Sequence, residues 1–203
     1  MAFLKRNQNT EKTEGSGSIL EYLHDVVYIL ALILVLFTFC MRVVIVSGSS
    51  MFSTLVDGDY LLLINRPLCG ELEQGDIVVA SMERFKDGEP IVKRVVATEG
   101  QTVDIDFRAG IVYVDGAALE EDYIYTPTHL SEGMEFPLVV DEGCVFLMGD
   151  NRNGSMDSRD PRIGIVDERE ILGKAVLLLV PGDGSWDHPV QRDFTRIGGL
   201  NHG

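Results

Sequence analysis

The sequence is poor in the residues on which metal and disulfide sites usually depend. It has three cysteines and four histidines in 203 residues, and no Cys-x-x-Cys pair, so the spacing typical of zinc ligands is absent. Cys69 and Cys144 lie far apart in the chain. Their pairing stays open because a sequence does not give their distance, although unpaired thiols are favoured.

Basic residues are also scarce. Lys and Arg number 17 against 32 Asp and Glu, which gives a net charge of −15. This balance argues against a nucleic-acid partner, because phosphate binding needs clustered cations. Eleven of the acidic residues lie between Glu99 and Glu142, where Arg108 is the one base. We interpret this segment as a solvated acidic surface, with a cation site as the alternative.

Sustained helical periodicity and internal repeats are missing after residue 43. Short β-branched and aliphatic runs separated by turn signals replace them, which is typical of strands. The predicted strands are Tyr60–Ile64, Ile77–Ala80, Ile91–Val96, Val103–Ile105, Ile111–Val114, Leu138–Val140, Val145–Met148 and Ile171–Val180. Asp115-Gly116 predicts a type I′ hairpin. The fold class is therefore all-β, with antiparallel, partly closed sheets.

One long apolar run stands near the N-terminus. Residues 26–41 contain no charge, Gly or Pro, and apolar residues on both sides bring the run towards the roughly 20 residues that span a bilayer. A cleaved secretory signal would have a shorter apolar core followed by small residues, whereas Phe39 to Arg42 are bulky. The sequence therefore favours a retained transmembrane anchor at 19–42.

Four segments follow from this interpretation. Residues 1–18 are polar and end in a Gly/Ser run, which predicts a flexible cytoplasmic tail. The bases near the helix ends lean slightly towards a cytoplasmic N-terminus, which leaves 43–181 as an extracytoplasmic β-rich domain. Residues 182–203 are polar, and we expect a loosely ordered tail there.

A loop rich in capping and turn residues spans Gly149–Asp160, directly after a predicted strand. Such a composition raises the hypothesis of a calcium loop. With Gly154 at the sixth loop position, the first position is Gly149 instead of Asp. The EF-hand pattern therefore fails.

Five strings in one order carry a family resemblance. They are Ser47–Leu55, Gly75–Val78, Ile91–Val95, Val114–Ile124 and Gly149–Arg159. Together with the N-terminal apolar run, they resemble the motifs of bacterial type I signal peptidases over roughly residues 20–181. The resemblance implies a membrane-bound serine endopeptidase that removes N-terminal signal peptides from exported preproteins, with residues 43–181 as its catalytic domain and no metal or organic cofactor.

The resemblance assigns Ser50 as the nucleophile and Lys93 as its general base. A serine hydroxyl needs a neighbouring base, and a lysine serves as one only when burial or polar donors lower its pKa from about 10.4. Alternation along 91–96 does not say which face of that strand is buried. None of the four histidines has motif context, which disfavours a Ser-His-Asp mechanism.

Supporting roles also come from the resemblance. Ser155 is expected to hydrogen-bond the Lys93 amine, and Asp157 and Arg159 to form an ion pair that braces the loop. Asp150 and Arg94 are expected as further structural partners.

The oxyanion is expected to bind the backbone N–H of Ser50 and a second donor. Some relatives supply that donor from a serine two residues before the nucleophile, where this chain has Gly48. The chain departs from the family's motif pattern at two other places, neither of which is Ser50 or Lys93. Ser53 replaces a proline, and residues 97–101 replace a Gly-x-Pro-Gly-Asp turn.

The resemblance further implies substrates with small residues at the first and third positions before the cut. Pocket-lining positions match Met51, Leu55 and Val92, and the strand before Ser50 adds Val44 and Val46. The substrate is expected to bind as an added strand and the lipid bilayer to concentrate enzyme and substrate together. Two other hypotheses remain: a catalytically inactive, membrane-anchored relative that acts as a binding or scaffolding module, and a self-cleaving Ser/Lys protease related to repressors.

Overall fold

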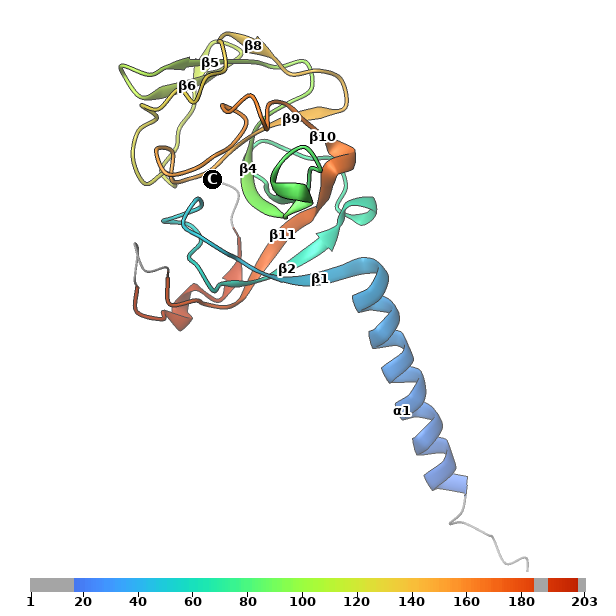
Figure 1. Cartoon of the computed structure of the whole chain (residues 1–203). Helices are drawn as coiled ribbons and strands as arrows, with labels where there is room; N and C mark the ends of the chain where they lie inside the picture. Colours follow the sequence, from blue (N-terminus) through green and yellow to red (C-terminus); the bar gives the residue numbers. More distant parts are fainter. Residues whose placement is uncertain (1–16, 185–189, 201–203) are drawn as a thin grey trace, which may run out of the picture. The chain divides into compact units, whose positions relative to one another are not determined.

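The chain divides into two compact units, Met1–Phe39 and Cys40–Gly203. The computed structural model describes residues 17–184 and 190–200, and Figure 1 traces their secondary structure. The predicted tail at 1–18 lies almost wholly outside the described residues.

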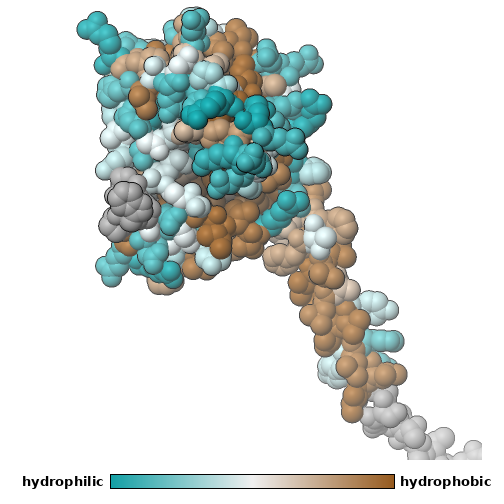
Figure 2. Space-filling view, in the orientation of Figure 1, coloured by the Kyte–Doolittle hydropathy of each residue, from teal (hydrophilic) through white to brown (hydrophobic). Residues whose placement is uncertain are grey.

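The first unit is the apolar helix α1 (Gly17–Val35), which continues into a π-helical turn, η1 (Leu36–Cys40). Its span Ile19–Cys40 has 22 residues with a mean hydropathy of 2.3, and none of them is buried. Its surface is largely hydrophobic in Figure 2. Thr38 donates its hydroxyl to the carbonyl of Leu34 at 2.6 Å, which satisfies that polar group within the helix. Among the described residues, no other helix is long and apolar enough to cross a membrane.

The second unit is built on an eight-stranded antiparallel sheet, here called the large sheet. In spatial order its strands are β1 (Met41–Ile45), β2 (Tyr60–Asn65), β11 (Ile171–Val180), β3 (Ile77–Ala80), β4 (Ile91–Thr98), β9 (Cys144–Met148) and β10 (Val166–Asp167), with β12 (Gly198–Gly199) paired to β11. The first strand begins at Met41, so the helical part ends just before the boundary expected for the anchor.

A second antiparallel sheet of four strands, here called the small sheet, is inserted between β4 and β9. Its order is β7 (Ala117–Ala118), β6 (Ile111–Val114), β5 (Thr102–Asp106) and β8 (Leu138–Val139). Asp115 and Gly116 both have positive φ, at 52° and 78°, which confirms the predicted hairpin turn between β6 and β7. Short 3₁₀ turns complete the unit: η2 (Arg66–Leu68), η3 (Lys86–Gly88), η4 (Glu168–Glu170) and η5 (Phe194–Arg196).

The large sheet curls because its long strands carry irregularities. The pairing of β11 shifts register between Ala175 and Leu177 and again between Leu178 and Val180, and β4 shifts between Val95 and Ala97. Such bulges bend a strand and increase its twist, and the curled arrangement is visible in Figure 1. The predicted fold class, all-β with antiparallel, partly closed sheets, is confirmed, and all eight predicted strands form with ends that agree to within two residues.

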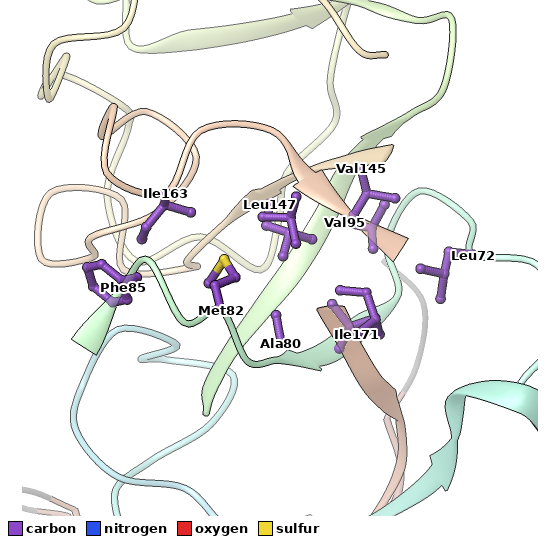
Figure 3. Close-up of a cluster of buried hydrophobic side chains, with 11 residues drawn as sticks. Leu72, Ala80, Met82, Phe85, Val95, Val145, Leu147, Ile163 and Ile171 are labelled. Atoms are coloured by element: carbon purple, nitrogen blue, oxygen red, sulfur yellow. The ribbon is translucent and has the colours of Figure 1, made fainter. Parts of the chain in front are cut away.

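Three clusters of buried apolar side chains hold the second unit together. Figure 3 shows the first, where side chains from β3, β4, β9 and β11 converge with those of Met82, Phe85 and Ile163. The second cluster lies between β1, β2, β3 and β11 and includes Met51 and Leu55. The third joins β4 and β9 to the small sheet.

The expectation of a loosely ordered C-terminal tail is wrong for residues 190–200. This segment forms η5 and β12, and β12 pairs with Leu177 and Leu178 of β11. Composition misled the interpretation, because a polar segment can be held by hydrogen bonds to a distant strand edge. The three cysteines are free thiols, so the pair Cys69–Cys144 is not bridged.

Candidate active site

Ser50 and Lys93 meet although 43 residues separate them. Lys93 lies on β4, and the loop after β1 carries Ser50 to it, so that Lys93 Nζ donates to Ser50 Oγ at 2.8 Å. The amine also donates to the carbonyl of Val92 at 2.9 Å. This is the geometry that a base needs in order to take a hydroxyl proton.

The Lys93 amine is buried, with 3% of the residue exposed. Burial lowers the pKa of Lys93 to about 8 from its usual 10.5, because desolvation penalises the charged form. Asp157, Asp150 and Glu132 oppose this shift, while Lys86 adds to it. The neutral form of the amine is therefore far more accessible near physiological pH than that of a hydrated lysine.

Both faces of β4 are buried, which answers the question that alternation left open. Lys93 and Arg94 point to opposite sides of the strand, and each is almost fully buried. Arg94 forms a bidentate pair with Asp150 at 2.9 and 2.7 Å and donates to the carbonyl of Gly75 at 2.8 Å. Its guanidinium lies 3.9 Å from the centre of the Tyr123 ring, which screens the pair from water.

The loop 149–160 is organised by a second buried ion pair. Arg159 and Asp157 are joined by two hydrogen bonds of 2.8 Å, and both side chains are fully buried. Asp157 also accepts from the backbone N–H of Gly149 at 3.0 Å, and Arg159 donates to the carbonyls of Arg152 and Leu130. The pair therefore fixes the path of the loop.

Ser155 is buried in this loop, but its hydroxyl makes no hydrogen bond to Lys93. Its Oγ has no hydrogen-bond partner within the described residues, which differs from the expected contact. The hydroxyl lies beside Gly149, where an added Cβ would come within 2.2 Å of Ser155 Oγ and 2.4 Å of the carbonyl oxygen of Ser50. Only glycine fits between these two groups.

Two residues that sequence reasoning missed also contact the site. Asn151 donates its backbone N–H to the carbonyl of Ser50 and its side-chain amide to the carbonyl of Ser49, both at 3.1 Å. It lies within the motif Gly149–Arg159, which is the signal that could have identified it. Glu132 accepts weakly from the backbone of Asp157 at 3.4 Å. Burial, with the nearby negative charge of Asp157, raises the pKa of Glu132 to about 7.

An apolar cavity of about 750 Å³ opens beside Ser50 and Lys93. Four of the five predicted pocket residues line it: Val44, Val46, Met51 and Val92. Leu55 does not line the cavity, because its side chain is fully buried in the second core cluster, next to Met51. Gly48 also lines it, and its backbone N–H is engaged by Asp57 Oδ1 at 2.6 Å.

The described residues contain no group of three or more His, Cys, Asp or Glu side chains that could hold a metal ion. The acidic segment 99–142 supplies hydrogen-bond acceptors at turns instead. Asp106 Oδ1, for example, accepts from the backbone of Arg108 and Ala109, and these hydrogen bonds lower the pKa of Asp106.

A buried amine within hydrogen-bond distance of a serine hydroxyl, beside an apolar cavity, is the arrangement that a hydrolase of the serine-nucleophile class requires. The chain belongs to the signal peptidase family, peptidase S26, whose family model matches residues 19–180. It is a serine peptidase, and the activity of its family is removal of signal peptides. The resemblance seen in the sequence is thereby confirmed.

Several named relatives are similar along most of their length. "Signal peptidase I T" of Bacillus subtilis is 34% identical over 87% of this chain and 94% of the relative. "Signal peptidase I" of Bacillus amyloliquefaciens is 32% identical over 88% and 90%. "Probable signal peptidase I-1" of Synechocystis is 36% identical over 67% and 69%. A crystal structure of a signal peptidase I from Enterococcus faecalis is 27% identical, covers 51% of this chain and 96% of that chain, and has a TM-score of 0.42.

Proposed function

We propose that the chain cleaves signal peptides through a Ser50/Lys93 dyad and an acyl-enzyme intermediate. The observation that carries the proposal is the 2.8 Å hydrogen bond between Lys93 Nζ and Ser50 Oγ, made by an amine whose burial lowers its pKa to about 8. A neutral amine at hydrogen-bond distance is what a weak nucleophile such as a serine hydroxyl requires.

In this mechanism the neutral Lys93 amine takes the Ser50 proton as Oγ attacks the scissile carbonyl carbon. The resulting ammonium gives that proton to the leaving amine nitrogen, the C–N bond breaks, and an ester to Ser50 remains. Lys93, again neutral, deprotonates a water molecule that attacks the ester, and the proton returns to Ser50 Oγ as the acid is released. The backbone N–H of Ser50 is the proposed oxyanion donor.

The buried pairs on either side of the dyad have the proposed role of positioning it. Arg94 and Asp150 brace β4 from the face opposite Lys93, and Asp157 and Arg159 brace the loop that carries Ser155. The Ser155 hydroxyl lies beside Gly149 and has no hydrogen-bond partner among the described residues, and its proposed role is to accept a hydrogen bond from the Lys93 amine during catalysis.

For the substrate, we propose an extended segment bound along the cavity, with small residues at the first and third positions before the cut. Val44, Val46, Met51 and Val92 give the cavity apolar walls, which suit short aliphatic side chains. Main-chain hydrogen bonds would supply the affinity for the extended segment, and the apolar pockets would supply the specificity for small side chains.

For the location, we propose a single membrane span with a cytoplasmic N-terminus and an extracytoplasmic catalytic domain. The 22-residue apolar span supports anchoring, and an anchored enzyme meets a membrane-bound substrate at raised effective concentration. A protease added outside cells with a permeabilised wall should digest residues 43–181. Digestion only after the membrane is opened would contradict this orientation.

Cleavage of a preprotein by the purified full chain in detergent tests the dyad. Ser50→Ala and Lys93→Ala should each lower kcat/KM at least about 10³-fold. Ser53→Ala is the matched control, because Ser53 is an exposed serine in the same loop, and it should cleave like the wild type. Product formation by Ser50→Ala at the wild-type rate would overturn the mechanism, whereas no product from the wild type itself would favour the catalytically inactive scaffolding alternative.

A further inference from the structure

The loop that carries Ser50 is closed by hydrogen bonds between its two ends. In this nucleophile loop, residues 46–59, Val46 N donates to the carbonyl of Asp59 at 2.8 Å and Gly58 N donates to the carbonyl of Val46 at 2.9 Å. Within the loop, Asp57 accepts from Gly48 N. The position of Ser50 therefore depends on what holds residues 57–59.

Asp59 is the buried centre of that end of the loop. It is fully buried, and its carboxylate accepts from Val56 N at 2.9 Å, from Gly182 N at 2.7 Å and from both terminal nitrogens of Arg196, at 3.1 and 2.7 Å. Charge-assisted bonds of this kind are strong. Gly182 lies so close that an added Cβ would come within 2.1 Å of the carbonyl oxygen of Asp57.

Arg196 also reaches the middle of the nucleophile loop. Its Nη2 donates to the carbonyl of Thr54 at 3.0 Å, so a single guanidinium joins two points of the loop, Thr54 and Asp59. Thr54 lies four residues after the nucleophile, in the turn where Leu55 N donates to the carbonyl of Met51. The guanidinium therefore fixes the part of the loop that follows Ser50.

The segment that supplies Arg196 is itself anchored at both ends. In this C-terminal strap, residues 190–200, Val190 N donates to the carbonyl of Asp183 at 3.0 Å, and Asp193 caps the turn η5 by accepting from Thr195 N at 2.9 Å. After the arginine, β12 pairs with β11, and Leu200 N donates to the carbonyl of Val176 at 3.1 Å. The Leu200 side chain packs against the core cluster that contains Met51 and Leu55. The strap lies outside residues 19–180, which the family model matches.

We infer that Arg196 is a positioning residue for the peptidase reaction, and that the C-terminal strap holds the nucleophile loop in register with Lys93. The inference rests on the proposed role of Ser50 as nucleophile. Arg196 touches no reacting atom and acts through Asp59 and Thr54. The strap thus adds to the site a brace that comes from 137 residues downstream of the loop.

Steady-state cleavage of a preprotein by full-length variants tests the inference. Arg196→Met keeps the aliphatic stem and removes both contacts, and kcat should fall about tenfold to hundredfold, because a small misplacement of a reacting group costs that much. KM should stay within about threefold, since β1 and β4 still line the cavity. Arg196→Lys should recover part of the loss through its charge opposite Asp59.

Arg192→Met is the matched control from the same strap. Arg192 pairs with Asp183 at the surface, where both side chains are more than half exposed, and its loss should leave kcat unchanged. Rates are compared at a temperature where melting curves show every variant folded. If Arg196→Met does not fold because Asp59 is left unpaired, the double variant with Asp59→Asn removes that charge and should show the same fall in kcat.

The pH profile separates positioning from a general structural defect. The pH at the midpoint of the kcat/KM profile should be the same in Arg196→Met as in the wild type, because Lys93 lies on β4 and does not contact the strap. A wild-type kcat in the folded variant, or a lower rate accompanied by a shifted midpoint, would overturn the inference. Ser50→Ala distinguishes the two proposals. Activity in that variant would refute the catalytic dyad itself. An inactive Ser50→Ala together with a fully active Arg196→Met would refute only the positioning role of the strap.

Discussion

The two sheets of the second unit are made in different ways. In the small sheet, β5 alternates between buried apolar and exposed acidic residues, and its interior is a cluster of aliphatic and aromatic side chains. In the large sheet, β4 is buried on both faces and carries two cations in succession, each held by specific partners. Apolar burial suffices to stabilise the small sheet, whereas the large sheet needs complete pairing of its buried polar groups.

The largest effect on stability should come from the buried pair behind Lys93. Arg94→Met leaves the fully buried carboxylate of Asp150 without its partner, and such a loss costs about 3–5 kcal/mol. Thermal or denaturant unfolding measures it. Arg169→Ala breaks an exposed pair with Asp167 and should leave the melting temperature unchanged. Equal melting temperatures for the two variants would contradict the distinction between the sheet interior and the surface.

The rate should depend on pH through Lys93. Only the neutral amine accepts the Ser50 proton, and its pKa of about 8 means that kcat/KM falls about tenfold per unit below pH 8, or roughly a hundredfold at pH 6 relative to the plateau above pH 9. Cleavage rates across this range measure the midpoint. The residual rate of Lys93→Ala should lack this step, and a midpoint near pH 10 would mean that the amine is hydrated.

Removing the amine should make the protein more stable at neutral pH. Because folding lowers the pKa of Lys93 from 10.5 to about 8, the charged form opposes folding below pH 8, and this cost disappears as the pH rises from 8 to 10.5. The variant Lys93→Met avoids this cost but loses two hydrogen bonds, each worth about 1 kcal/mol. Its free energy of unfolding at pH 7 should therefore exceed that of the wild type by roughly 1–2 kcal/mol. Denaturant unfolding at pH 7 and pH 10 checks the sign, and a variant less stable at pH 7 than the wild type would contradict it.

The smallest effect should come from the small sheet. Ile105 is buried on β5, and Ile105→Val removes one methylene at a cost of about 0.5–1.5 kcal/mol. Because this sheet contributes no residue to the cavity, kcat should equal that of the wild type. A change in kcat at a temperature where the variant is folded would show that the two sheets are coupled.

Local patterns predicted much of this fold. Alternation found β5 and β6, and the Asp115-Gly116 dipeptide found the hairpin between β6 and β7, because both signals depend on neighbouring residues. The motif strings led to Ser50 and Lys93 and to the pairs around them. Alternation did not resolve β4, since a strand buried on both faces has no polar side.

Most of the missed features depend on contacts between distant segments. Arg196 pairs with Asp59 across 137 residues, and Glu132 lies against the 149–160 loop through its contact with Asp157; neither contact has a local signature. The hydroxyl of Ser155, expected on Lys93, lies beside Gly149 instead. Composition alone misjudged the C-terminal segment.

Because Lys93 and Arg94 are adjacent on β4, insertions and deletions of single residues in this strand are restricted. Hydrogen bonds to β3 and β9 set the frame of this strand, and deletion or insertion of a single codon within it would turn the guanidinium towards Ser50 and the amine towards Asp150. Length variation is therefore forbidden inside β4. It should be tolerated at the Asp115-Gly116 turn, where extra residues would extend into solvent.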